Sequence, residues 1–272
     1  MSPTLSRVIT SSAAAIAAAG SLIAISTQSA GAAITEEYAA LGDSFASGNG
    51  TRNPDINLGC YRSSEAYGPE IAAERASTTL VFPACGGAVT DDVINTQSKS
   101  LTAETDWVTV SIGGNDVGFA ELLLNCGGSL DEPLCLAKAD EVNQRIDTDL
   151  GPKLDTAYAS IKQGAPNAGV ISIGYPRFFG SDISCLDADG ITPNEATALN
   201  GLADNLEAKV ADRSRAAGIQ HINPIQQFAG HDICSSTPYL NGKAELNAAD
   251  AYHPSPEGYS NGFKPLIRKI MG

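Results

Sequence analysis

Positive charge and histidine are scarce in this sequence. Of its 272 residues, 17 are Lys or Arg and 31 are Asp or Glu, which gives a formal net charge of −14. An acidic surface repels a phosphate backbone, and no segment is rich in Lys or Arg, so we expect no nucleic-acid partner. The chain has three His and no C-x-x-C pair, so the usual spacing of zinc ligands is missing. We therefore expect a protein that needs no metal and no organic cofactor.

Charge is almost absent from residues 1–33, where one Arg is the only charged residue. Residues 8–25 are rich in Ala and moderately apolar, and small residues follow them. This order is typical of a secretory signal peptide. We predict a signal peptide over 1–33, cut near Ala32 or Ala33, and a single secreted, extracellular domain over 34–272. An uncleaved membrane anchor is the alternative, although Ser, Thr and Gly dilute the apolar run.

The sequence contains six Cys, an even number that indicates a disulfide framework in an exported chain. They are Cys60, Cys85, Cys126, Cys135, Cys185 and Cys234. The count alone leaves the pairing open, and pairing of nearest neighbours along the sequence is the simplest arrangement.

Short apolar runs, nearly continuous and rich in β-branched residues, indicate a parallel sheet buried on both faces. They span residues 37–41, 79–82, 107–112, 169–173 and 218–222. Helical patterns lie between and after them, at 67–75, 142–162, 193–217 and 255–271. Thr192 and Glu195 form a capping box with Pro193 in the first turn, and Ser255 can cap the last helix. This alternation predicts an α/β fold, a doubly wound three-layer α/β/α sandwich of about five parallel strands.

The distinctive segments of the sequence follow the predicted strands. Gly42-Asp43-Ser44 follows the first strand, Cys85-Gly86-Gly87 the second, and Gly113-Gly114-Asn115 the third. Sites in such sheets form at the carboxyl ends of the strands, so we expect these segments to meet. The six Cys also fall in loops or beside helices on this side. We predict that the disulfides hold the loops of the site more than they tie the core.

Ser44 is the candidate nucleophile. A serine at a strand-to-helix turn is lifted out of the sheet, and its N–H points the same way as the amides of the first helical turn. Gly42 and Gly48 permit a tight turn there. The alternative is that Ser44 only caps the following helix. The motif is not G-x-S-x-G, so an α/β-hydrolase assignment is not supported.

His253 is the candidate base, because a hydroxyl nucleophile needs a neutral imidazole within hydrogen-bonding distance. Asp250 lies three residues before it, and one short turn could place this carboxylate on Nδ1 and leave Nε2 facing Ser44. A surface D-x-x-H beside a helix cap is the alternative. His221 lies in a strand-like run and His231 in a loop, so we expect neither to be the base.

Asn115 is the candidate oxyanion donor, because an amide side chain supplies N–H groups without a titrating charge. The backbone N–H groups of Gly87 and Ser44 could complete an oxyanion hole. Taken singly, each glycine is more simply an ordinary turn residue. Asp43 and Asp116 are expected to be structural, because a carboxylate aimed at a developing oxyanion would oppose the reaction.

Taken together, these segments resemble the four sequence blocks of the SGNH (GDSL) hydrolases. The blocks are Gly42-Asp43-Ser44, Gly87, Gly114-Asn115-Asp116 and Asp250-x-x-His253. With its signal peptide and six Cys, the chain is especially similar to the secreted actinobacterial lipases and esterases, although it has Gly86 where relatives often carry Ser. The resemblance covers almost the whole chain after the signal peptide.

This resemblance implies a flavodoxin-like sandwich and serine-dependent ester hydrolysis. It assigns Ser44 as nucleophile, His253 as base with Asp250 orienting it, and Ser44, Gly87 and Asn115 as the oxyanion hole. In some relatives a backbone carbonyl takes the part of the Asp. It also implies the disulfides Cys60–Cys85, Cys126–Cys135 and Cys185–Cys234.

The substrate is less closely defined by the sequence. Aromatic residues near the expected edge could line an acyl groove, and each taken singly could equally belong to the core. They are Phe45, Phe119, Tyr175, Phe178 and Phe179. We expect a monomeric lipase or esterase for lipid acyl esters, with phospholipids second and acetylated sugars or cell-envelope esters third, and with transient contact to a lipid surface. A secreted binding protein that has lost activity on the same scaffold is the alternative.

Overall fold

Parallel strands form the centre of the structure, a computed structural model that describes residues 35–126, 131–243 and 249–272. These residues contain one five-stranded sheet in the order β2-β1-β3-β4-β5, with every neighbouring pair parallel. The strands are β1 (Glu36–Gly42), β2 (Thr78–Val81), β3 (Trp107–Ser111), β4 (Gly169–Ile173) and β5 (Gln220–Ile222). The predicted signal peptide, residues 1–33, lies outside the described residues.

All five strands fall where the apolar runs predicted them. Residues 38–41 of β1 are fully buried, as expected for a strand with helices on both faces. The strand predicted at 218–222 begins later, at Gln220, because Gly218 caps the end of the preceding helix. It adopts φ 68° as the left-handed cap of that helix, a conformation that glycine takes without steric cost.

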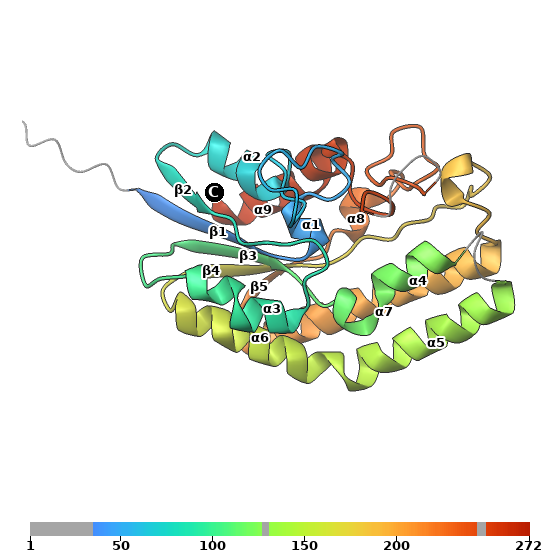
Figure 1. The fold of residues 1–272 in the computed structure, drawn as a ribbon, viewed down its shortest axis with the longest axis horizontal. Coiled ribbons are helices and arrows are strands. Elements are labelled where there is room, and N and C mark those ends of the chain that lie inside the picture. The colour runs from blue at the N-terminus through green and yellow to red at the C-terminus, as the bar shows by residue number, and fades with distance from the viewer. Residues whose placement is uncertain (1–34, 127–130, 244–248) are drawn as a thin grey trace, which may run out of the picture. The chain divides into compact units, whose positions relative to one another are not determined.

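Helices cover both faces of the sheet, which confirms the predicted three-layer sandwich (Figure 1). One layer holds α1 (Ser44–Ser47), α2 (Tyr67–Glu74), α8 (Ile225–Phe228) and α9 (Lys264–Met271). The other holds α3 (Thr90–Asn95), α4 (Phe119–Asn125), α5 (Glu132–Thr148), α6 (Leu150–Gly164) and α7 (Pro193–Ala217). None of the helices in the described ranges combines the length and apolarity needed to span a membrane.

The single helix predicted over 142–162 is wrong, because the structure has two helices there, α5 and α6. They meet at Asp149, where Figure 1 shows a bend. Pro152 explains the break: it has no N–H to donate to the carbonyl of Thr148, and its ring would clash with that carbonyl in a continuous helix. In the first turn of a new helix the same proline is tolerated.

The predicted helix starts are confirmed at both capped positions. Thr192 accepts from the N–H of Glu195, and the Glu195 carboxylate accepts from the N–H of Thr192, so both halves of the capping box form. The Ser255 hydroxyl accepts from the N–H of Gly258 at 3.2 Å. The last helix then passes through a wide π-type turn, η4 (Gly258–Phe263), before α9.

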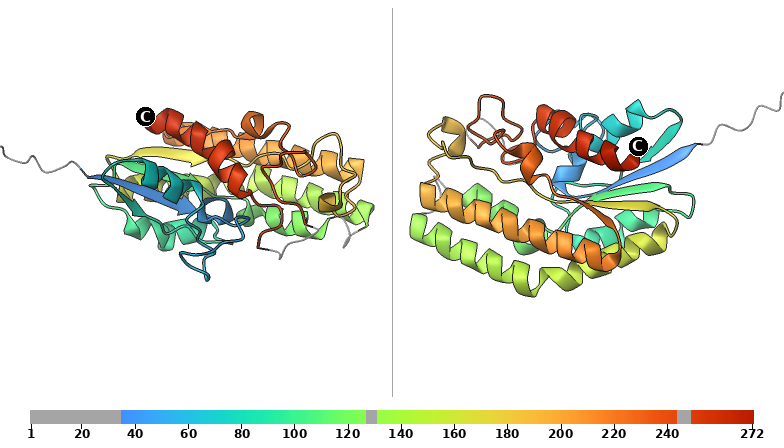
Figure 2. Two further views of the ribbon diagram at one scale, coloured as in Figure 1. Left: turned by 90° about the horizontal axis from the view of Figure 1, so that it is seen from above. Right: turned by 180° about the vertical axis from the view of Figure 1, so that it is seen from behind.

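The order of the strands places a switch point between β1 and β3. The chain leaves β1 through α2 on one face of the sheet and leaves β3 through α4, α5 and α6 on the other (Figures 1 and 2). At such a point the connections diverge and leave a crevice at the carboxyl ends of the two strands. The segments that begin with Asp43 and Ile112 enter this crevice.

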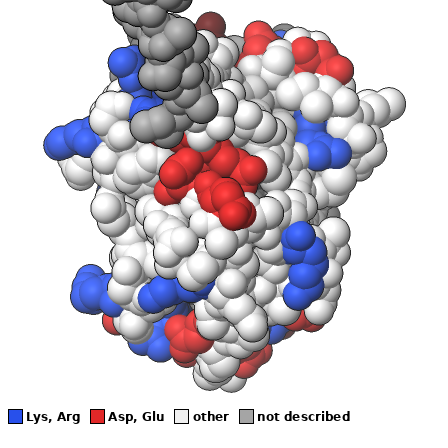
Figure 3. Space-filling model, turned by 90° about the vertical axis from the view of Figure 1, so that its left-hand side faces the viewer, with Lys and Arg blue, Asp and Glu red and all other residues white. Residues whose placement is uncertain are grey.

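The opposite side of the molecule, where β1 begins, carries charged groups in separate clusters. Figure 3 shows acidic side chains in the middle of this face, with Lys and Arg side chains set apart around them. Glu36, the first residue of β1, forms an ion pair with Arg75 at 2.6 Å.

Candidate active site

Ser44 is the first residue of α1, directly after a turn that only glycine fits. Gly42 ends β1 with φ 128°, and a Cβ there would lie 2.1 Å from the carbonyl oxygen of Ser111 on the neighbouring strand. Asp43 caps α1 by accepting from the N–H of Phe45 at 2.9 Å. The chain therefore changes direction within one residue, and the Ser44 side chain stands at the carboxyl end of β1.

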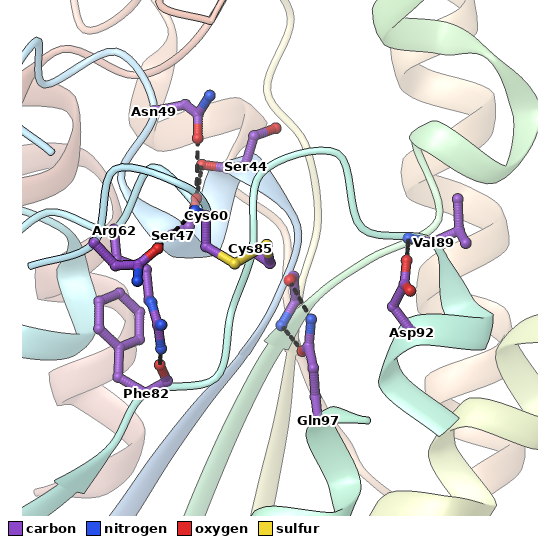
Figure 4. Close-up of a disulfide and its surroundings, with 12 residues drawn as sticks. Ser44, Ser47, Asn49, Cys60, Arg62, Phe82, Cys85, Val89, Asp92 and Gln97 are labelled. Atoms are coloured by element: carbon purple, nitrogen blue, oxygen red, sulfur yellow. Dashed lines mark hydrogen bonds between the residues drawn. A yellow bond between two sulfur atoms is a disulfide. The ribbon is translucent and has the colours of Figure 1, made fainter. Parts of the chain in front are cut away.

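The Gly42 turn is held by Gln97, which the sequence analysis did not identify. The Gln97 amide accepts from the Gly42 N–H at 2.7 Å and donates to the Gly42 carbonyl at 2.9 Å (Figure 4). The two residues are 55 positions apart, and Gln97 is buried. No local pattern marks such a residue, because its role depends on the meeting of two distant segments.

His253 lies against Ser44, with Nε2 2.7 Å from Oγ. Its Nδ1 lies 2.8 Å from the carbonyl oxygen of Ala251. A carbonyl can only accept, so Nδ1 carries the proton and Nε2 is free to accept from the Ser44 hydroxyl. Burial lowers the pKa of His253 to about 4, so the imidazole is neutral at physiological pH.

The contact expected between Asp250 and Nδ1 is wrong, because the Ala251 carbonyl occupies that position. Tyr252, between Ala251 and His253, has the left-handed φ of 56°. This turn directs the backbone carbonyl, rather than the carboxylate one residue earlier, at the ring. The Asp250 carboxylate instead accepts from the N–H of Gly50 at 3.1 Å and from the hydroxyl of Tyr61 at 2.7 Å.

Asn115 and Gly87 lie on two loops that hydrogen bonds join. The Asn115 side chain donates to the carbonyl of Ala88 at 3.0 Å, and Asp116 accepts from the N–H and hydroxyl of Thr90 at 2.9 and 2.7 Å. Within the described ranges, the N–H groups of Gly87 and Ser44 donate to no protein acceptor. Ser44 and Asn115 line the same pocket as His253, whereas Gly87 lines a neighbouring hollow beside Cys60 and Cys85.

The two aspartates of the glycine-rich segments hold the local structure. Asp43 accepts from the Tyr175 hydroxyl at 2.5 Å, and that hydroxyl accepts from the N–H of Gly114 at 3.2 Å. This chain of bonds links the turn of Ser44 to the turn before Asn115. Burial raises the pKa of Asp43 to about 7.

A narrow, largely apolar pocket of about 30 Å³ adjoins Ser44 and His253. Four of the five aromatic residues that the sequence placed at this edge contribute to its wall: Phe45, Phe119, Tyr175 and Phe178. Phe179 instead packs in the core against Tyr252. The rest of the wall includes Leu123 and Leu124 of α4, which the sequence analysis missed although the run Leu122-Leu123-Leu124 follows the Asn115 segment closely.

The other two histidines take structural positions. The imidazole of His221 lies between Ser172, at 2.7 Å from Nδ1, and Glu207, at 2.5 Å from Nε2. The ring of His231 stacks on Tyr239 with centroids 3.8 Å apart. Within the described part of the chain, no group of His, Cys, Asp and Glu is arranged to hold a metal ion.

The six Cys form the three disulfides Cys60–Cys85, Cys126–Cys135 and Cys185–Cys234, as the family resemblance implied. Figure 4 shows the Cys60–Cys85 bridge, whose Cys85 lies two residues before Gly87. Cys126–Cys135 joins the end of α4 to α5. Cys135 is inside the first turns of α5 rather than in a flanking loop, and both Cys126 and Cys135 are fully buried. The second bridge is thus part of the core, contrary to the prediction that the disulfides hold the loops of the site more than the core.

Comparison with known proteins gives the same fold and identifies a family. The model of the GDSL-like lipase/acylhydrolase family matches residues 40–260. Lipase 1 of Streptomyces coelicolor is 37% identical over 255 residues, which are 93% of this chain and 94% of that lipase. Crystal structures of an extracellular lipase of Streptomyces rimosus and of a phospholipase A1 of Streptomyces albidoflavus match with TM-scores of 0.81 and 0.80. Each is 35% identical and covers 86% of this chain and 99% of its own.

Proposed function

This chain belongs to the GDSL-like lipase/acylhydrolase family and is a carboxylic ester hydrolase, and we propose that Ser44 is its nucleophile and His253 its general base. The observation that carries the proposal is the 2.7 Å contact between the Ser44 hydroxyl and Nε2 of a neutral imidazole. The Ala251 carbonyl fixes the tautomer that this contact requires.

The reaction follows from these positions. The Ser44 oxygen attacks the ester carbonyl while its proton passes to Nε2 of His253. The N–H groups of Ser44 and Gly87 and the Asn115 amide stabilise the oxyanion, each contributing about a hundredfold or more in rate. The protonated imidazole, held by the Ala251 carbonyl, then protonates the departing alcohol. Water, activated by the same imidazole, releases the acyl group from Ser44.

We propose lipid acyl esters as the substrates, because the pocket beside Ser44 is walled mainly by Phe119, Leu123, Leu124 and Phe178. Burial of an acyl chain against such a wall is favourable by about 25 cal/mol per Å² of apolar area. Phospholipids are the second candidate, supported by the similarity to a phospholipase A1. Acetylated sugars come third, because the pocket wall offers little polar surface to a sugar.

We also propose that the enzyme is secreted and acts as a monomer. The N-terminal sequence has the order of a signal peptide, and the three disulfides suit an oxidising compartment. The nucleophile, the base and the oxyanion donors all come from one chain, so catalysis does not call for a second copy.

The test is hydrolysis of p-nitrophenyl esters, from acetate to palmitate, by the oxidised protein, with Ser44→Ala alongside. We expect activity that depends on Ser44 and is greatest for medium or long acyl chains. A maximum at acetate would overturn the lipid assignment but leave the esterase intact. Folded protein without activity at any chain length would favour the binding-protein alternative.

A further inference from the structure

The Asp250 carboxylate is buried, yet it does not touch the imidazole of its own loop. Only 2% of the residue is exposed, and its two oxygens accept from the Gly50 N–H and the Tyr61 hydroxyl. A buried charge is costly unless donors satisfy it, so these two bonds tie Asp250 to the segments that supply them. We name residues 249–253 the histidine loop.

The Tyr61 bond leads to the loop that carries Gly87, residues 85–88, which we name the glycine loop. Tyr61 follows Cys60, which is bonded through its sulfur to Cys85. The carbonyl of Cys60 also accepts from the N–H of Gly86 at 2.9 Å. A hydrogen bond, one covalent bridge and a second hydrogen bond therefore connect the histidine loop to the glycine loop.

The Gly50 bond leads to the segment after α1, which carries Ser44 at its start. Asn49 donates from its side chain to the carbonyl of Ala249 at 2.7 Å. The fit at Gly50 is close, because a Cβ there would lie 2.3 Å from the carbonyl oxygen of Pro254. Asp250 thus stands where the segments of the nucleophile, the base and one oxyanion donor are joined.

We propose that Asp250 is a positioning residue that couples the histidine loop to the glycine loop through Tyr61 and the Cys60–Cys85 disulfide. The inference rests on the function proposed above for Ser44 and His253. Loss of the Tyr61–Asp250 bond lets His253 and Gly87 shift relative to Ser44. Both shifts weaken interactions made in the transition state more than binding of the substrate, so kcat falls while KM changes little.

The experiment compares Tyr61→Phe, Asp250→Ala and the double variant on the best p-nitrophenyl ester. We expect Tyr61→Phe to lower kcat about tenfold and to change KM by less than about twofold. The double variant should be no slower than Asp250→Ala alone, because Asp250→Ala already removes the acceptor of the Tyr61 hydroxyl. A Tyr61→Phe enzyme with wild-type kcat, or effects on kcat that multiply in the double variant, would overturn the coupling.

Tyr158→Phe is the matched control. Tyr158 is buried, and its hydroxyl accepts from Ser214 at 3.4 Å, outside the candidate active site. The Tyr158→Phe variant also loses a buried tyrosine hydroxyl, but we expect its kcat to equal that of the wild type. If its kcat falls as far as that of Tyr61→Phe, the loss of any buried tyrosine hydroxyl would explain the effect, and the inference would be overturned. Labelling of the wild-type enzyme by a fluorophosphonate separates the two claims. If Ser44 is not labelled, both the proposed nucleophile and the positioning role of Asp250 are overturned. If Ser44 is labelled normally but the effects of the two substitutions on kcat multiply, only the positioning role is overturned.

Discussion

Burial of the His253 imidazole determines the pH range in which Ser44 can be activated. His253 is 8% exposed as a residue, and desolvation lowers the pKa of its imidazole to about 4, with the Ala251 carbonyl and the Asp250 charge opposing that fall. The imidazole must be neutral to accept the Ser44 proton, so activity is present above this pKa and is lost as the pH falls through it.

We therefore expect kcat/KM of the free enzyme to stay level from neutral pH down to about pH 5 and to fall with a midpoint near pH 4. Initial rates on a soluble ester across this range, with folding checked by circular dichroism at each pH, make the measurement. A midpoint near 6.5, the value of an exposed imidazole, would show that His253 is not buried as described.

The residues that meet at the site differ in how far the sequence could predict them. Ser44, Asn115 and His253 stand in short polar segments after strands or before a capped helix, and parallel topology brings such ends together. The Ala251 carbonyl could not be chosen over Asp250, because the choice depends on the left-handed backbone of Tyr252. Gln97 could not be found, because only the tertiary fold brings it to Gly42.

At the scale of elements, the position of Ser44 depends on the turn between β1 and α1. Gly42 has a positive φ and lies against β3, so a side chain there meets backbone that cannot move away. Gly201 lies inside helix α7, and a Cβ added there would have no neighbouring atom within 4 Å.

We predict that Gly42→Ala lowers kcat/KM at least about a hundredfold, because the turn must open and carry Ser44 away from His253. Gly201→Ala should leave activity unchanged and raise the free energy of unfolding by about 0.5–1 kcal/mol through helix propensity. Ester hydrolysis and urea denaturation of both variants measure the contrast. Wild-type activity in Gly42→Ala would contradict the role given to this turn.

Elements with a strong apolar pattern or a clear cap could be predicted, whereas two features of the helices could not be found from the apolar pattern. The strands and the Thr192 cap follow from runs of apolar residues and from capping chemistry. The break between α5 and α6 was missed because the apolar periodicity of residues 142–162 continues across Pro152. Helix α4 is seven residues long, too short for periodicity to mark it.

At the scale of the whole molecule, the disulfides differ in what they hold. Cys185–Cys234 closes the longest loop, 49 residues, and joins two segments without a candidate catalytic residue. Cys60–Cys85 closes a loop of 25 residues and adjoins the glycine loop. In the chain-entropy account each bridge stabilises the fold by roughly 3–4 kcal/mol.

We predict that replacing either pair by Ser lowers Tm by roughly 10 °C. Loss of Cys185–Cys234 should leave kcat at 25 °C within about twofold of wild type, whereas loss of Cys60–Cys85 should lower it about tenfold because the Gly87 donor is displaced. Calorimetry and ester hydrolysis on the two double variants provide the comparison. Equal kcat values would remove the distinction between a stabilising and a site-forming bridge.

Ester hydrolysis by this enzyme depends on the activation of Ser44 as a nucleophile by His253. The most direct measurement is the rate at which a fluorophosphonate modifies the oxidised protein, with the modified residue identified by peptide mass spectrometry. We expect modification of Ser44 alone, at a rate at least about a hundredfold lower in a His253→Ala variant of unchanged fold. Modification elsewhere, or an equal rate in His253→Ala, would contradict this activation.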